Sequence, residues 1–190
     1  MKTVKIAIFS LLAVAVACGA FIYSGVYGVA ADDPHTKQVY WLLNIARERS
    51  VEARAASIEP PADLGDPKRL SVGAGLYAEM CAGCHLAPGM EKTEIAQGLY
   101  PAAPPLAQAR KSVPGRDFWI IKHGIKMSGM AAWGKTHSDE LVWNMVAFLR
   151  KLPYLSKSDY DALVRSAPAD HDETMQADHG NGDGHDHQHE

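Results

Sequence analysis

The sequence predicts an all-α protein, with one small helical domain between an apolar N-terminal segment and a polar C-terminal tail. Two observations carry this prediction. Apolar residues recur at the three- and four-residue spacing of helices in the stretches 39–51, 117–123 and 141–152. No alternation of strand and helix patterns is visible around them. The formal net charge of −3 is unevenly distributed, because no Lys or Arg follows Arg165.

The N-terminal segment has the length and composition of a transmembrane helix. Lys2 and Lys5 come first, and residues 6–31 contain no charged side chain. About 20 apolar residues cross a bilayer core, and flanking basic residues favour the cytoplasmic side. We therefore predict a transmembrane signal-anchor over residues 1–31, with the rest of the chain exported.

Two other interpretations of this segment remain open. Ala15-Val16-Ala17 has the small-x-small form that signal peptidase accepts, although cleavage there would leave the apolar residues 21–31 at a free N-terminus. Cys18 could instead carry a lipid. All three interpretations place the mature protein outside the cytoplasm.

Residues 32–66 are expected to form a juxtamembrane amphipathic helix and a linker. Asp32-Asp33-Pro34 has the composition of a helix start, and charged residues interrupt the apolar ones up to about Ser57. This helix either packs on the following domain or serves as a stalk or docking helix. The proline-rich stretch from Glu59 to Pro67 predicts a stiff connector.

Cys81-Ala82-Gly83-Cys84-His85 is the most specific motif of the chain. Two thiols at this spacing can each add to a haem vinyl group, and the adjacent imidazole can reach the iron, so the pattern indicates one covalent haem c. A zinc site would need further ligands, and Cys18 lies in the apolar N-terminal segment. A thioredoxin-like site would need strand–helix alternation, which is not visible here.

The remaining helices of this domain, which we place at residues 67–165, follow from local patterns. Glycines before Tyr77 indicate close approach by another helix or by the haem. An apolar helix over 117–123 ends at Gly124. The last strong helix starts near Thr136-His137-Ser138-Asp139, which has a capping-box-like pattern, and Pro153 ends it.

Residues from about 71 to 155 resemble a class I monohaem cytochrome c, of the bacterial branch related to oxidase-associated cytochrome c subunits. The resemblance rests on Gly73-x-Gly75-x-Tyr77 before the haem motif, on Ile125-x-x-x-Gly129-Met130, and on the aromatic-rich last helix. It implies a small all-α domain around one covalent haem. Cys81 and Cys84 would hold the haem and His85 would be the proximal iron ligand.

The resemblance also implies a methionine as the second axial ligand. Met130 fits that place best, and Met127 and then His123 are the alternatives. If Met130 is not a ligand, it would serve as a core-packing residue. Pro104-Pro105-Leu106 resembles the proline segment whose carbonyl orients the proximal histidine in the family. Tyr100 and Trp133 are either haem-edge contacts or ordinary core aromatics.

Six of the basic residues between the haem motif and the last helix would attract an acidic redox partner if they ring the haem edge. An ordinary solvated surface is the alternative, and we expect no nucleic-acid partner. These residues are Arg110, Lys111, Arg116, Lys122, Lys126 and Lys135.

Residues 166–190 have the composition of a disordered acidic tail, with seven acidic residues and neither Lys nor Arg. Alternating His and Asp near the end is also typical of short copper- or zinc-binding tracts. Solvation without metal is the competing role. The candidate ligands are His179, His185, His187 and His189.

His/Met ligation closes the iron to substrates, which favours single-electron transfer over catalysis. The sequence therefore predicts a non-enzymatic, membrane-tethered cytochrome c of a bacterial inner membrane, with the haem domain and C-terminus facing the periplasm. It would serve respiratory redox partners. The alternatives are a copper- or zinc-handling haem protein, an open-iron enzyme or gas sensor, and a fixed electron-transfer subunit of a larger oxidoreductase.

Overall fold

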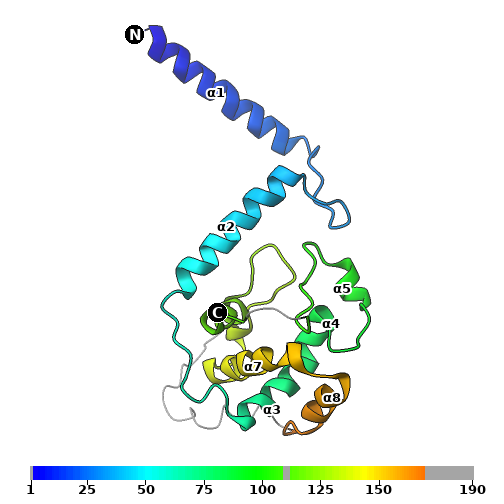
Figure 1. The fold of residues 1–190 in the computed structure, drawn as a ribbon. Helices are drawn as coiled ribbons and strands as arrows, with labels where there is room; N and C mark the ends of the chain where they lie inside the picture. Colours follow the sequence, from blue (N-terminus) through cyan, green and yellow to red (C-terminus); the bar gives the residue numbers. More distant parts are fainter. Residues whose placement is uncertain (1, 109–111, 170–190) are drawn as a thin grey trace, which may run out of the picture. The chain divides into compact units, whose positions relative to one another are not determined.

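A computed structural model describes residues 2–108 and 112–169, and within these ranges it contains helices and no strands (Figure 1). The prediction of an all-α protein is confirmed. The chain divides into two compact units, residues 1–34 and 35–190. The predicted metal ligands of the tail lie outside the described residues, as do Arg110 and Lys111.

The first unit contains helix α1, Lys2–Tyr23, whose residues are all exposed. It has 22 residues, and an 18-residue window within it has a mean hydropathy of 2.5. The helix is therefore long and apolar enough to cross a membrane, although a signal sequence near the N-terminus has the same properties. The helix is shorter than the charge-free stretch. It ends before Gly25, whose φ of +67° does not continue a right-handed helix.

The second unit begins with α2, Lys37–Ala55. The predicted helix start at Asp32-Asp33-Pro34 is wrong. Residues 30–33 form a turn in which the Asp33 amide donates to the Ala30 carbonyl, and the Thr36 hydroxyl caps the helix by accepting from the Val39 amide.

The C-terminal half of α2 packs on α6, Pro114–His123. Val51 is 2% exposed, and Arg116 of α6 donates to Glu48 at 2.5 Å. A Cβ on Gly115 would lie 2.5 Å from the Ile58 carbonyl oxygen, so glycine is needed for this close approach.

The core of the domain is the crossing of α3, Pro67–Leu76, with α7, Asp139–Lys151. Asp66 caps α3 by accepting from the Lys68 amide at 2.7 Å. Ser138, which lies within the predicted start at residues 136–139, caps α7 by accepting from the Leu141 amide. At the crossing, a Cβ on Gly73 would lie 2.0 Å from the Asn144 carbonyl oxygen. The predicted close approach is therefore confirmed at Gly73, with a helix as the partner.

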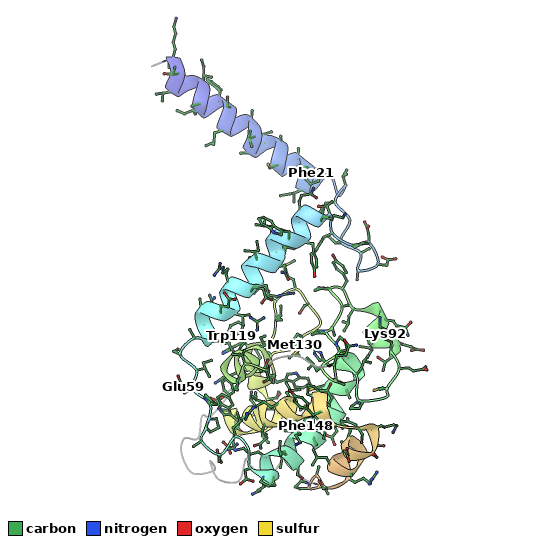
Figure 2. The ribbon with its side chains drawn as sticks, viewed as in Figure 1. Phe21, Glu59, Lys92, Trp119, Met130 and Phe148 are labelled. Atoms are coloured by element: carbon green, nitrogen blue, oxygen red, sulfur yellow. The ribbon has the colours of Figure 1, made fainter. Side chains whose placement is uncertain are left out.

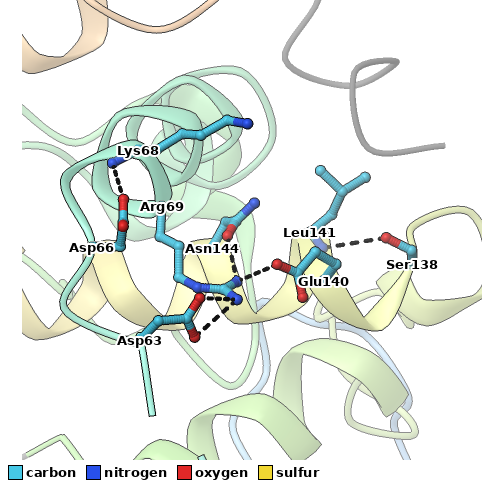
Figure 3. Close-up of polar contacts among 8 residues, drawn as sticks. All are labelled: Asp63, Asp66, Lys68, Arg69, Ser138, Glu140, Leu141 and Asn144. Atoms are coloured by element: carbon cyan, nitrogen blue, oxygen red, sulfur yellow. Dashed lines mark hydrogen bonds and ion pairs between the residues drawn. The ribbon is translucent and has the colours of Figure 1, made fainter. Parts of the chain in front are cut away.

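A polar cluster joins the same two helices to the preceding linker (Figure 3). The guanidinium of Arg69, which is 7% exposed, pairs with Asp63 at 2.8 Å and with Glu140 at 2.7 Å. It also donates to the side-chain oxygen of the fully buried Asn144 at 2.9 Å. Because Asp63 belongs to the linker whereas Glu140 and Asn144 belong to α7, the cluster fixes how the linker enters the domain.

Helix α8, Lys157–Arg165, was not expected from apolar periodicity. Ser156 caps it by accepting from the Asp159 amide. Its buried Tyr160 meets Tyr77 and Phe148, with ring centroids 6.5 Å and 6.2 Å away. The shorter elements are the π-helical turn η1 (Tyr77–Cys81), α4 (Ala82–His85), α5 (Glu94–Gly98) and the 3-10 turns η2 (Trp133–Lys135) and η3 (Leu152–Tyr154).

Candidate haem site

The Cys-x-x-Cys-His motif lies on two connected helical turns. Cys81 ends η1, and Cys84 and His85 belong to α4, so both sulfurs and the imidazole come from about one and a half turns. Burial, with a smaller effect of Cys84, raises the pKa of the Cys81 thiol to about 12. A thiol of this kind is a poor nucleophile at neutral pH, which argues against a thioredoxin-like function.

The proline segment at residues 104–106 fixes the orientation of the His85 ring. Its Nδ1 donates to the Pro104 carbonyl oxygen at 2.8 Å, and the Leu106 amide donates to the His85 carbonyl at 3.0 Å. The carbonyl that the resemblance suggested is therefore at hydrogen-bond distance. Because Nδ1 carries the proton, the lone pair of the ring is on Nε2, which is the form that ligates iron.

The side chains of Tyr77 and Thr93, which the sequence did not predict as contacts, form hydrogen bonds to backbone carbonyls in and directly after the haem motif. The Tyr77 hydroxyl donates to the Leu86 carbonyl at 2.5 Å. The Thr93 hydroxyl donates to the Gly83 carbonyl at 2.5 Å and also caps α5. The Thr-Glu pair at 93–94 is a helix-capping pattern that could have revealed Thr93, although not its contact with Gly83.

The second ligand candidate lies in a closed loop after α6. The loop begins at Gly124, where φ is +64° and where a Cβ would lie 2.6 Å from the Met130 carbonyl oxygen. The Ile125 amide donates to that same carbonyl at 3.1 Å. Ser128 accepts from the Met130 amide and donates to the Ile125 carbonyl. Met130 itself is partly buried and packs against the apolar core (Figure 2).

The two alternative ligands are placed less favourably. Met127 is 93% exposed and has a positive φ of 59° at the tip of the loop. His123 is exposed at the end of α6, where its ring lies 5.0 Å from that of Trp119. Among the three candidates, only Met130 packs against the core.

The loop that carries Met130 meets the segment that orients His85. A Cβ on Gly129 would lie 2.5 Å from Cδ2 of Leu99, and Leu99 comes five residues before Pro104. The segment that leads to Pro104 thus contacts the loop directly beside Met130.

The aromatic candidates have different surroundings. Trp133 packs against the core and lies edge-on to His137, with ring centroids 5.5 Å apart. The Tyr100 hydroxyl accepts from the His35 amide at 3.0 Å, and the two rings are also edge-to-face. Tyr100 therefore connects the proline segment to the chain just before α2.

The predicted basic rim is partly neutralised. Arg116 pairs with Glu48, and Lys122 pairs with Asp139 at 2.6 Å. Lys126 and Lys135 are exposed. A steering surface made of all six basic residues is therefore not supported, because two of the charges already have acidic partners within the domain.

These donors fit a covalently bound haem. Two thiols, an imidazole with its Nδ1 proton fixed and a partly buried thioether are the donor types that would hold the haem of a class I monohaem cytochrome c. They lie on a helical fold with a glycine at its helix crossing. Residues 68–149 match the family described as cytochrome c oxidase, cbb3-type, subunit III. Residues 68–149 are thus a cytochrome c domain similar to that of this family. No curated protein and no solved structure matches the chain.

Proposed function

We propose that the chain is a membrane-tethered monohaem cytochrome c that passes single electrons between respiratory redox partners. Cys81 and Cys84 hold the haem through thioether bonds, His85 is the proximal ligand and Met130 the distal one. The bound haem supplies an iron that gains and loses one electron. The cytochrome c domain itself implies haem-based electron transfer.

The observation that carries this proposal is the hydrogen bond from His85 Nδ1 to the Pro104 carbonyl. A metal-binding histidine normally donates its other ring N–H to such an acceptor, which fixes the ring and raises its basicity. The haem motif provides the His85 imidazole as a ligand, and the hydrogen bond to Pro104 fixes the orientation of that ring.

We place the haem domain on the periplasmic side of a bacterial inner membrane. Lys2 and Lys5 precede the apolar helix α1, and this charge bias favours a cytoplasmic N-terminus. A tether raises the effective concentration of the domain near membrane-bound donors and acceptors.

The first test compares two methionines of one loop. In the full-length, haem-loaded protein, Met130→Ala should abolish the methionine-to-iron charge-transfer band and allow carbon monoxide to bind the reduced iron. Met127→Ala is the matched control, because Met127 is 93% exposed, and it should leave the spectrum unchanged. Carbon monoxide binding by the unaltered protein would instead support an open-iron enzyme or sensor.

A fixed subunit of a larger oxidoreductase is the second candidate, favoured by the description of the matching family as an oxidase subunit. Membranes would be solubilised in mild detergent and the haem-bearing species sized. A free carrier runs as the chain in its detergent micelle, whereas a subunit elutes with a larger complex that contains further redox centres.

A further inference from the structure

The N-terminal half of α2 carries large apolar side chains that the domain does not bury. Five of them stay between 39% and 64% exposed, within six consecutive positions. We call residues 40–45 the apolar segment of α2. Its exposed apolar residues are Tyr40, Trp41, Leu42, Leu43 and Ile45.

The two halves of α2 have opposite environments. The C-terminal half is held on the domain by buried Val51 and by the pair of Glu48 with Arg116 at 2.5 Å. That attachment fixes the helix but leaves the apolar segment exposed. A soluble surface rarely keeps this many large apolar side chains together unless another phase or partner covers them.

The spacing of these side chains indicates that lipid covers them and that a single protein surface does not. Residues 40–43 are consecutive, and successive residues of an α-helix are turned by about 100°. Their side chains therefore surround the helix instead of forming one stripe. A protein partner typically buries one face of a helix in a groove, whereas lipid contacts a helix from every side that it enters.

The composition of the segment and its position shortly after α1 indicate that the lipid is the interfacial region of a bilayer. Tyr and Trp are enriched at membrane–water interfaces because their rings are apolar and their N–H and O–H groups polar. Only residues 24–36 separate the segment's helix from α1. Six residues are too few to span a bilayer core, which takes about 20.

We propose that the apolar segment of α2 inserts into the headgroup–acyl boundary of the membrane that anchors α1. The inference rests on the membrane tether of the proposed function. The inserted segment is then a second membrane contact besides α1. Because Glu48 and Val51 hold α2 on α6, this second contact restricts how the domain can rotate above the membrane. It thereby selects which face of the domain meets membrane-bound redox partners.

The test uses the full-length, haem-loaded protein in vesicles of phosphatidylcholine and phosphatidylglycerol, in a Cys18→Ser background. Leu42→Cys reports on the apolar segment and Glu52→Cys is the control on the same helix, since Leu42 is 61% exposed and the Glu52 side chain 56%. Both are treated with a membrane-impermeant maleimide. A second sample contains a phosphatidylcholine with a photoreactive acyl chain, and its adducts are mapped by mass spectrometry.

We expect Leu42→Cys to react about tenfold more slowly than Glu52→Cys, and lipid adducts to form within residues 40–45. Equal maleimide rates would overturn the inference. Slow reaction without lipid adducts would also overturn it, because another protein or a second copy would then cover the segment. Release of the unaltered protein by alkaline carbonate would refute the tether itself, which separates that failure from failure of the insertion.

Discussion

At the scale of single residues, Gly73 determines how closely α3 and α7 cross. A Cβ there would lie 2.0 Å from the Asn144 carbonyl oxygen and 2.9 Å from Cβ of Phe148. Both obstacles are parts of a buried helix and cannot rotate away. The helices would have to separate to accept any side chain.

Gly73→Ala should therefore lower the free energy of unfolding by about 3 kcal/mol, through overpacking of the helix crossing. Denaturant unfolding of the haem-loaded protein measures this. Gly65→Ala is the control, since its Cβ would meet nothing within 4 Å. Equal stability of the two variants would show that the crossing is looser than described.

The pair of Asp63 with Arg69 makes stability depend on acid. The hydrogen bond and charge of Arg69 hold the pKa of Asp63 below its ordinary value of 3.8. A carboxylate with a lowered pKa in the folded state stabilises the protein above the unfolded pKa, and this contribution is lost as pH falls through the folded pKa.

Asp63→Asn should accordingly be less stable than the unaltered protein at neutral pH, and the difference should shrink as pH falls below 3.8. Unfolding followed at several pH values between about 6 and about 2 checks this. Glu59→Gln changes an exposed carboxylate of the same linker and should show no such convergence. A difference that is constant with pH would contradict the role of the Asp63 charge.

The haem-binding residues differ in how well sequence alone predicts them. The thiols and His85 are adjacent in the chain, so their spacing alone indicates their chemistry. Pro104 lies 19 residues from His85, and no local pattern reports a contact over that distance. The resemblance suggested it, and the folded chain was needed to establish it. Met130 and Met127 are three residues apart; the resemblance favours Met130, and its packing against the core, compared with the 93% exposure of Met127, supports that preference.

At the scale of elements, α8 shows where periodicity fails. The nine-residue helix has one buried residue, Tyr160. Leu163 and Val164 also pack on the core, but their three- and four-residue spacing from Tyr160 occurs only once in so short a helix. Its stability comes from the Ser156 cap and from packing of Tyr160 against Tyr77 of η1 and Phe148 of α7. The longer helix α7 has eight buried residues and was predicted almost to the residue.

Tyr160→Ala should lower the free energy of unfolding by about 3 kcal/mol, because it leaves a cavity beside Tyr77 and Phe148. Tyr154→Ala, at a tyrosine that is 77% exposed, should change it by less than about 0.5 kcal/mol. Thermal unfolding of both variants gives the comparison. A small effect at Tyr160 would mean that α8 is dispensable for the domain.

The prediction of where α2 starts was wrong because residue type alone does not choose between several suitable helix caps. Asp32-Asp33-Pro34 and Thr36 are all suitable helix starts by composition. The choice between them depends on a hydrogen bond from the Val39 amide to Thr36 and on the Ala30–Asp33 turn. Neither is encoded in residue type alone.

At the scale of the whole molecule, residues 1–34 and 35–190 are separate compact units. Replacing residues 1–34 by a cleavable signal peptide should therefore leave the optical spectrum and melting temperature of the haem domain unchanged. The shortened protein should be removed from membranes by alkaline carbonate, whereas the full-length protein should remain. Altered ligation in the shortened protein would show that the first unit supports the haem site.

The contact of Leu99 with Gly129 bears on the speed of electron exchange. It joins the segment that leads to Pro104 to the loop that carries Met130, and it therefore restrains movement of that loop. If His85 and Met130 ligate the iron as proposed, this restraint would help to keep the metal–ligand distances nearly the same in the ferric and ferrous states. The inner-sphere reorganisation energy is small in such a centre, and its transfer rate is controlled by donor–acceptor distance and driving force.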